Sequence, residues 1–161
     1  MKPVAQQEIR EISFQLLKET FEGPAPEGAS AFLNKGTGLF QTLDEIGADA
    51  ASRLTRPGGS TVAAHTEHLR FYVVVHDKLL RGSTEEIDWA QSWRIKRVNG
   101  AEWGNLKQQC RRAYSTFIEH LRAVDNWGED EISVATSVMA HTAYHLGAIR
   151  QLILAQQGNR D

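Results

Sequence analysis

The chain is poor in cysteine and in long apolar runs. Its single cysteine, Cys110, excludes an intrachain disulfide and any metal motif built from cysteine pairs. Cys110 lies on an apolar helical stripe, which favours a core position over a nucleophile. No stretch approaches the roughly 18 consecutive apolar residues of a membrane-spanning helix, and the N-terminus lacks the apolar region of a signal peptide. We therefore expect a cytoplasmic protein that has no membrane partner.

An excess of positive charge is also lacking. The formal net charge is −2 over 161 residues, so no broad positive field would draw the protein onto nucleic acid. The most basic stretch, Arg94-Ile95-Lys96-Arg97, is short enough to be a solvated loop or a local contact for an anion. No segment shows sustained alternation of apolar and polar residues, so no β-sheet is expected.

The sequence is instead rich in helical periodicity. Apolar residues recur every three or four positions over most of the chain, which predicts an all-α protein. An N-terminal helix over residues 4–22 should end at Gly23-Pro24, because both residues disfavour a continuing helix. Four further helices are expected over residues 30–54, 61–81, 101–125 and 133–157.

These four helices predict a bundle over about residues 30–157, within a single domain of residues 1–161. Short turns should make the first and second helices antiparallel, and likewise the third and fourth. The connection of residues 83–100 is long enough to cross one end of the bundle, so that the second and third helices run parallel. The predicted fold is therefore a four-helix bundle of up-down-down-up topology with an additional N-terminal helix.

Two pairs of histidines lie on these helices. His141 and His145 are one helical turn apart on the last helix, which places both imidazoles on one face. Such a pair also arises by chance on a half-buried helix, but His65 and His68 supply a second cluster on another apolar helix. Buried imidazoles without partners would each cost about 1–3 kcal/mol, and a metal ion that binds them removes that cost. The spacing predicts a metal site, although periodicity alone does not decide between His65 and His68.

The residues around these histidines resemble a known family. Two segments carry the resemblance: Ser60-Thr-Val-Ala-Ala-His65-Thr-Glu-His68-Leu-Arg70 and Ala140-His141-Thr-Ala-Tyr144-His145-Leu-Gly147. They resemble the two histidine helices of the DinB-like superfamily, which includes bacillithiol- and mycothiol-dependent transferases. The resemblance implies an up-down-down-up bundle in which His68, His141 and His145 bind one divalent metal ion. Zinc or nickel is the expected ion, with iron or manganese as alternatives. His65 would then lie behind the ligands, at the mouth of the site, or in competition with His68.

The same resemblance implies a small-molecule substrate. Family members with known activity transfer a low-molecular-weight thiol to an electrophile, so a thiol S-transferase or a related detoxifying enzyme is expected. Two alternatives stay open: a metal-dependent hydrolase of a small molecule, and a non-enzymatic dimeric module that binds a ligand or metal. A thiol-binding site would need an anion-recognising rim, for which Arg94, Lys96 and Arg97 are the candidates. Groups that could act as a base or orient a substrate are Glu67, Arg70, Tyr72 and Tyr144.

The connection of residues 83–100 is long for a compact domain and contains Trp89 and Trp93. It leaves its helix at the end opposite His68. Two interpretations are open. The connection could run back along the bundle and cover the metal site, or its tryptophans could plug the far end of the core.

A homodimer is expected as well. Phe14, Leu17 and Phe21 extend the apolar face of the N-terminal helix, and exposed apolar area of this kind often marks an interface. The resemblance implies the same state, because proteins of that family often pair through their bundle helices.

Overall fold

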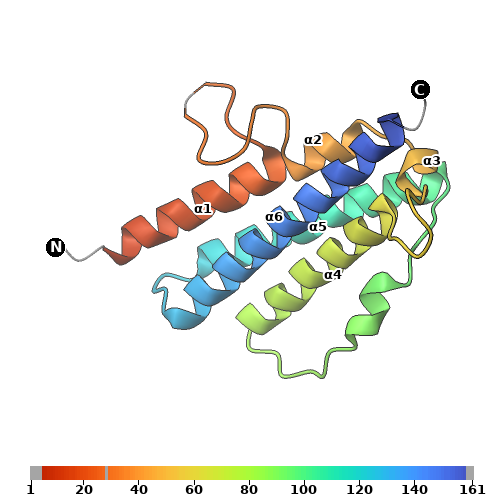
Figure 1. The fold of residues 1–161 in the computed structure, drawn as a ribbon. Coiled ribbons are helices and arrows are strands. Elements are labelled where there is room, and N and C mark those ends of the chain that lie inside the picture. Colours follow the sequence, from red (N-terminus) through yellow and green to blue (C-terminus); the bar gives the residue numbers. More distant parts are fainter. Residues whose placement is uncertain (1–4, 28, 159–161) are drawn as a thin grey trace.

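The computed structural model describes residues 5–27 and 29–158, and this part of the chain is all-helical without a β-strand (Figure 1). The absence of strands here agrees with the sequence prediction. None of the helices in these residues combines the length and hydropathy needed to cross a membrane. The elements are α1 (Gln6–Glu22), α2 (Leu39–Asp44), α3 (Ala48–Ala51), α4 (Val62–Leu80), the 3-10 helix η1 (Trp89–Trp93), α5 (Gly100–Ala123) and α6 (Glu129–Gly158).

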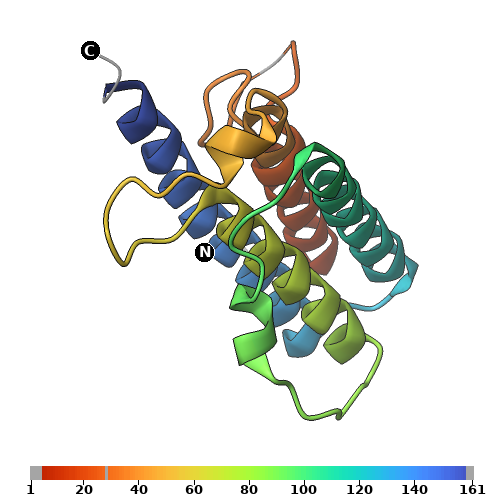
Figure 2. The same cartoon turned by 90° about the vertical axis from the view of Figure 1, so that its right-hand side faces the viewer.

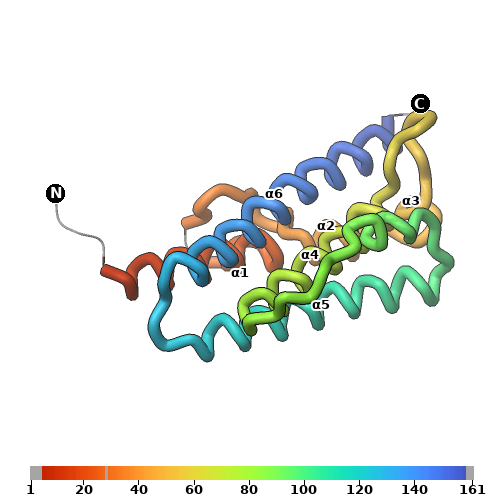
Figure 3. Tube along the Cα trace, turned by 90° about the horizontal axis from the view of Figure 1, so that it is seen from below, coloured from red at the N-terminus to blue at the C-terminus, as the bar shows by residue number. Residues whose placement is uncertain are grey.

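The four long helices α1, α4, α5 and α6 lie side by side and form the body of the molecule (Figures 1 and 2). α1 and α6 run in one direction, and α4 and α5 run in the other (Figures 1 and 3). α4 packs against both α5 and α6, whereas α1 packs against α6 and α2. α4 and α5 are thus parallel neighbours, and the α4–α5 connection (residues 81–99) returns along the molecule between them, as its length predicts.

The prediction of one helix over residues 30–54 is wrong. Only α2 and α3 form there, after an irregular segment. Gly36 has a φ of +77°, and Gly38 lies so close to the end of α1 that a Cβ on it would be 2.3 Å from the backbone nitrogen of Gly23. Glycine permits both features and weakens a helix. α1, expected as an addition, is itself one of the four long helices; its predicted first residue, Val4, lies outside the described residues.

The other three predicted helices are confirmed, with ends that differ by a few residues. α5 begins at Gly100 because a capping box precedes it: the Asn99 side chain accepts a hydrogen bond from the Glu102 backbone N–H, and the Glu102 carboxylate accepts one from the Asn99 backbone N–H. α6 begins before the expected Ser133. Acidic residues fill its first turn, which favours the positive end of the helix dipole, and the backbone N–H of Gly128 donates to Glu131 at 2.6 Å.

One apolar core fills the space between the long helices. Its fully buried members include Leu17 and Phe21 of α1, Val73 of α4, Phe117 of α5 and Ile149 of α6, each at most 1% exposed. Burial of such a side chain contributes about 1.5–3 kcal/mol to stability. The histidine-bearing helices α4 and α6 are therefore held against each other by a packed apolar interior.

Candidate metal centre

The packing of α4 along α6 brings the predicted site residues together. α4 carries His65 and His68, and α6 carries His141 and His145. In His68, His141 and His145, one candidate ligand atom of each ring lies within 4.8 Å of the others. His68 and His145 are buried, and His141 is partly buried. The structure thus forms a three-histidine cluster from the residues that the sequence singled out, and this cluster could hold a metal ion.

The closest approach within the cluster is between His68 and His141. Their Nε2 atoms are 3.0 Å apart, and the centroids of the three rings are separated by 4.5–5.0 Å. A tetrahedral ion with metal–nitrogen bonds of about 2.0–2.1 Å holds its ligand nitrogens about 3.3 Å apart. Small ring movements would therefore suffice to place a first-row divalent ion between these two atoms. The donor set fits such an ion.

Ser92 determines which nitrogen of His68 faces the cluster. The Ser92 hydroxyl donates to the Trp89 carbonyl at 2.7 Å, so its lone pairs are left to accept from His68 Nδ1, also at 2.7 Å. Nδ1 of His68 therefore carries the ring hydrogen, and Nε2 presents its lone pair toward His141. Ser92 is completely buried. Ser92 was not among the residues predicted from the sequence, in which its one signal is a small polar residue beside Trp93 in the long connection.

His65 lies beside the cluster and contacts only one of its members through a hydrogen bond. Its Nδ1 is 2.8 Å from Nδ1 of His145, and its ring meets Trp93 edge-on with centroids 5.5 Å apart. Of the places left open for His65, the structure favours the one behind the ligands. His65 thus contacts Nδ1 of His145 in the same way that Ser92 contacts Nδ1 of His68.

The cluster is electrically neutral at physiological pH because its environment disfavours imidazolium. Burial, followed by the nearby His141, His65 and His68, lowers the pKa of His145 to about 3. Burial, His68 and His76 lower the pKa of His141 to about 4. Burial likewise lowers the pKa values of His68 and His65. The rings therefore keep lone pairs available at neutral pH, which is the form that binds a metal.

Aromatic side chains form the walls of the site. Trp93 stacks on His68 with ring centroids 4.2 Å apart, and Tyr72 stacks on His141 at 3.7 Å. Tyr72 stacks on His76 through its other face at 3.9 Å. Of the two interpretations of the 83–100 connection, the structure favours the first: η1 lies against α4 and places Trp93 on His68, beside the histidine cluster. Trp89 packs on Tyr72 and remains 41% exposed.

Several polar residues that the sequence placed near the histidines are engaged elsewhere. Both carboxylate oxygens of Glu67 accept from the Arg70 guanidinium at 2.7 Å, so neither group is free to serve the cluster. Tyr144 is 73% exposed at the surface of α6. Cys110 is a core residue, as expected, and burial raises the pKa of its thiol to about 12.

Comparisons with known proteins return no match. No protein-family model, curated protein sequence or solved structure matches the chain.

Proposed function

We propose that His68, His141 and His145 bind one divalent metal ion and that the protein is a metal-dependent enzyme acting on a small molecule. The observation that carries the proposal is the convergence of three neutral imidazoles from two helices in a partly buried site. Three protein ligands leave a coordination position open, as in catalytic zinc sites. Zinc or nickel suits the imidazole donors, with iron or manganese as alternatives.

We further propose that the reaction is the transfer of a low-molecular-weight thiol, in keeping with the resemblance to the DinB-like superfamily. When bound, a divalent ion lowers the pKa of a coordinated thiol or water and so supplies a nucleophile at neutral pH. A hydrolase would need a carboxylate near the histidines, and the best candidate, Glu67, is paired with Arg70. This pairing favours the transferase over the hydrolase.

The chain's own residues would orient the site and keep water from it. Ser92 fixes the ring of His68, and a ligand bond at Nε2 of His145 would leave its Nδ1 hydrogen to be donated to His65. Trp93 and Tyr72 flank the rings with apolar surface. Partial dehydration strengthens electrostatic interactions within such a site.

The directions of the long helices support an up-down-down-up four-helix bundle as the fold type. In this assignment α1, α4, α5 and α6 are the four bundle helices, and α1 takes the place that the sequence analysis gave to residues 30–54. We also propose a homodimer, although not through the residues first suggested. Leu17 and Phe21 are completely buried within the chain's own core and are not available to a partner, and Phe14 is partly buried against Trp127.

Metal analysis tests the proposal directly. Protein purified without an affinity tag should contain about one divalent ion per chain, and the His68→Ala, His141→Ala and His145→Ala variants should each lose it, because two imidazoles hold such an ion weakly. His65→Ala should keep most of the metal. Elemental analysis after gel filtration measures the content.

The control is His76→Ala, which removes a histidine of α4 that lies outside the cluster. It should leave the metal content unchanged. Metal that is lost in His65→Ala yet retained in His68→Ala would overturn the assignment. Metal-loaded protein should then bind a low-molecular-weight thiol, and a screen in which no thiol binds would remove the transferase hypothesis while leaving the metal site.

A further inference from the structure

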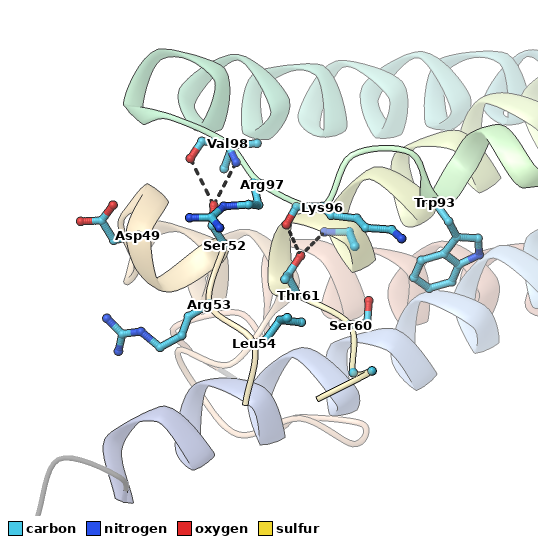
Figure 4. Close-up of a pocket in the computed structure, with 13 residues that line it drawn as sticks. Asp49, Ser52, Arg53, Leu54, Ser60, Thr61, Trp93, Lys96, Arg97 and Val98 are labelled. Carbon is cyan, nitrogen blue, oxygen red and sulfur yellow. Dashed lines mark hydrogen bonds between the residues drawn. The ribbon is translucent and has the colours of Figure 1, made fainter. Parts of the chain in front are cut away.

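A cleft of about 1080 Å³ opens beside the metal centre (Figure 4). It lies between the turn that leads into α4 and residues 93–98 of the α4–α5 connection. The side chains that matter for its chemistry are Arg53, Ser60, Trp93, Lys96 and Arg97. A volume of this size suits a small organic molecule.

The cleft carries an excess of positive charge. Arg53, Lys96 and Arg97 line it against a single carboxylate, that of Asp49. Within residues 5–27 and 29–158, none of these three cations forms an ion pair, whereas the neighbouring Arg94 lies 3.7 Å from Asp88. In Figure 4 the Lys96 side chain points toward Trp93, whereas those of Arg53 and Arg97 point the other way, so the cations are spread along the cleft. Cations that line a concave surface without carboxylate partners attract an anion.

Hydrogen bonds connect the two walls of the cleft, so its shape is preorganised before a ligand binds. The Thr61 hydroxyl donates to the Lys96 carbonyl at 2.8 Å and also accepts from the Ala64 backbone at 3.1 Å. The Ser52 hydroxyl donates to the Val98 carbonyl at 3.1 Å and accepts from its N–H at 2.9 Å (Figure 4). The cation-bearing backbone is therefore tied to α3 and to the first turn of α4, which lowers the entropy lost when a ligand binds.

Trp93 connects the cleft to the metal centre. Its side chain lines the cleft, and the same ring stacks on His68. Ala64, another lining residue, directly precedes His65. A molecule whose anionic group contacts the cations of this cleft could therefore have the rest of its length beside Trp93, at the wall of the three-histidine cluster.

We infer that this cleft binds the anionic group, a carboxylate or a phosphate, of the small molecule on which the metal centre acts. The inference rests on the proposed function for the link to the metal, but anion binding itself is independent of it. Arg97 and Arg53 offer planar guanidinium groups that can bind either group through paired hydrogen bonds. Lys96 adds a mobile ammonium on the Trp93 side of the cleft (Figure 4). The inferred ligand is thus a small anion-bearing molecule, with its reactive end directed toward Trp93.

Calorimetric titration of the 161-residue chain with inorganic phosphate and with succinate tests the inference. Saturable binding of either probe is expected, and the probe that binds more tightly identifies the preferred group. The double variant Lys96→Gln/Arg97→Gln should weaken binding about tenfold or more, because it removes two charge-assisted contacts. Arg94→Gln is the matched control in the same segment, and its affinity should equal that of the wild type.

Three outcomes would overturn the inference. The first is that neither probe binds saturably. The second is that Arg94→Gln weakens binding as much as the double variant does. The third is that binding is lost in His68→Ala but kept in the double variant, because the anion would then bind to the metal ion and not to the cleft. Metal content is measured on the same samples. Anion binding without stoichiometric metal would contradict the proposed function but support the anion-binding cleft. Stoichiometric metal without anion binding would support the metal site but contradict the inference about the cleft.

Discussion

Ser92 is the residue whose contribution to the candidate site is easiest to isolate. In Ser92→Ala, the Nδ1 hydrogen of His68 loses its acceptor, at a cost of about 1–3 kcal/mol for the buried donor. The ring is then free to turn, and metal affinity should fall by about tenfold to a hundredfold, as for other residues that orient a ligand. A titration against a competing chelator measures the dissociation constant.

Ser83→Ala provides the control for this prediction. Ser83 lies in the same connection, and its hydroxyl accepts from the Glu85 backbone and contacts no histidine. Its metal affinity should stay at the wild-type value. An unchanged dissociation constant in Ser92→Ala would show that the hydrogen bond does not orient His68.

Some residues of the candidate site could be predicted from the sequence, and others could not. His141 and His145, four positions apart, follow from helical periodicity, because neighbours on one face of a helix share a direction. On the second apolar helix periodicity left His65 and His68 as alternatives, and the family resemblance selected His68. Ser92 could not be predicted. Its contact with His68 spans 24 positions and depends on the path of an irregular connection, which no periodic pattern describes.

At the scale of single elements, Glu19 of α1 organises the irregular segment that follows it. This buried carboxylate accepts hydrogen bonds from Ser30 Oγ and from the backbone N–H groups of residues 31–33, at 2.7–2.8 Å. Burial alone would raise the pKa of Glu19, but the hydrogen bonds from Leu33, Phe32, Ala31 and Ser30 outweigh it and lower the pKa to about 2. The ionised form therefore stabilises this part of the fold.

Glu19→Gln should destabilise the protein by about 1–3 kcal/mol at pH 7, since the amide leaves some of these buried donors without an acceptor. The contribution of a carboxyl with a lowered pKa is fully present above its ordinary value of 4.5 and is lost as pH falls toward 2. Urea unfolding at several pH values measures the difference between variant and wild type, which should shrink below pH 4.5.

Glu11→Gln is the matched control, because Glu11 is exposed on the same helix and bonds only to Gln7. It should change stability little at any pH. A Glu19→Gln deficit that stays constant from pH 7 to pH 3 would contradict the assigned role of the ionised carboxylate.

The helices themselves were predictable where an apolar stripe meets a core. α4, α5 and α6 each contribute fully buried apolar residues, for example Leu69, Phe117 and Val138. Residues 30–54 show similar spacing, yet Phe32 is 46% exposed and Leu54 is 54% exposed. Periodicity does not reveal that Gly38 must lie against the end of α1, and this contact decides the local structure.

At the scale of the whole molecule, the outer face of α6 is the surface that best suits the proposed homodimer. Ala140, Tyr144, Gly147, Gln151 and Leu154 recur at helical spacing there, and all five are exposed. Gly147, between Tyr144 and Leu154, would allow a second helix to approach closely. Sedimentation velocity at micromolar concentration should show a dimer, and the Tyr144→Glu/Leu154→Glu variant should sediment as a monomer.

Ile12→Glu is the control for dimerisation, because Ile12 is a large apolar residue that is 53% exposed on a different helix, α1. It should remain dimeric. A wild-type protein that sediments as a monomer at this concentration would remove the dimer proposal. A dimer that persists in the α6 variant would show that the interface lies on another face of the molecule.

The distance along the chain between His68 and His141 has a consequence for folding. The two residues are 73 positions apart, so an ion bound to both would act as a cross-link that closes a loop of that length. By the chain-entropy estimate used for disulfides, such a closure disfavours the unfolded ensemble by about 4 kcal/mol. In a chain with a single cysteine, the proposed ion would thus take over the role that a disulfide has in secreted proteins. The proposed metal ion would thus both supply the chemistry of the site and stabilise the folded state.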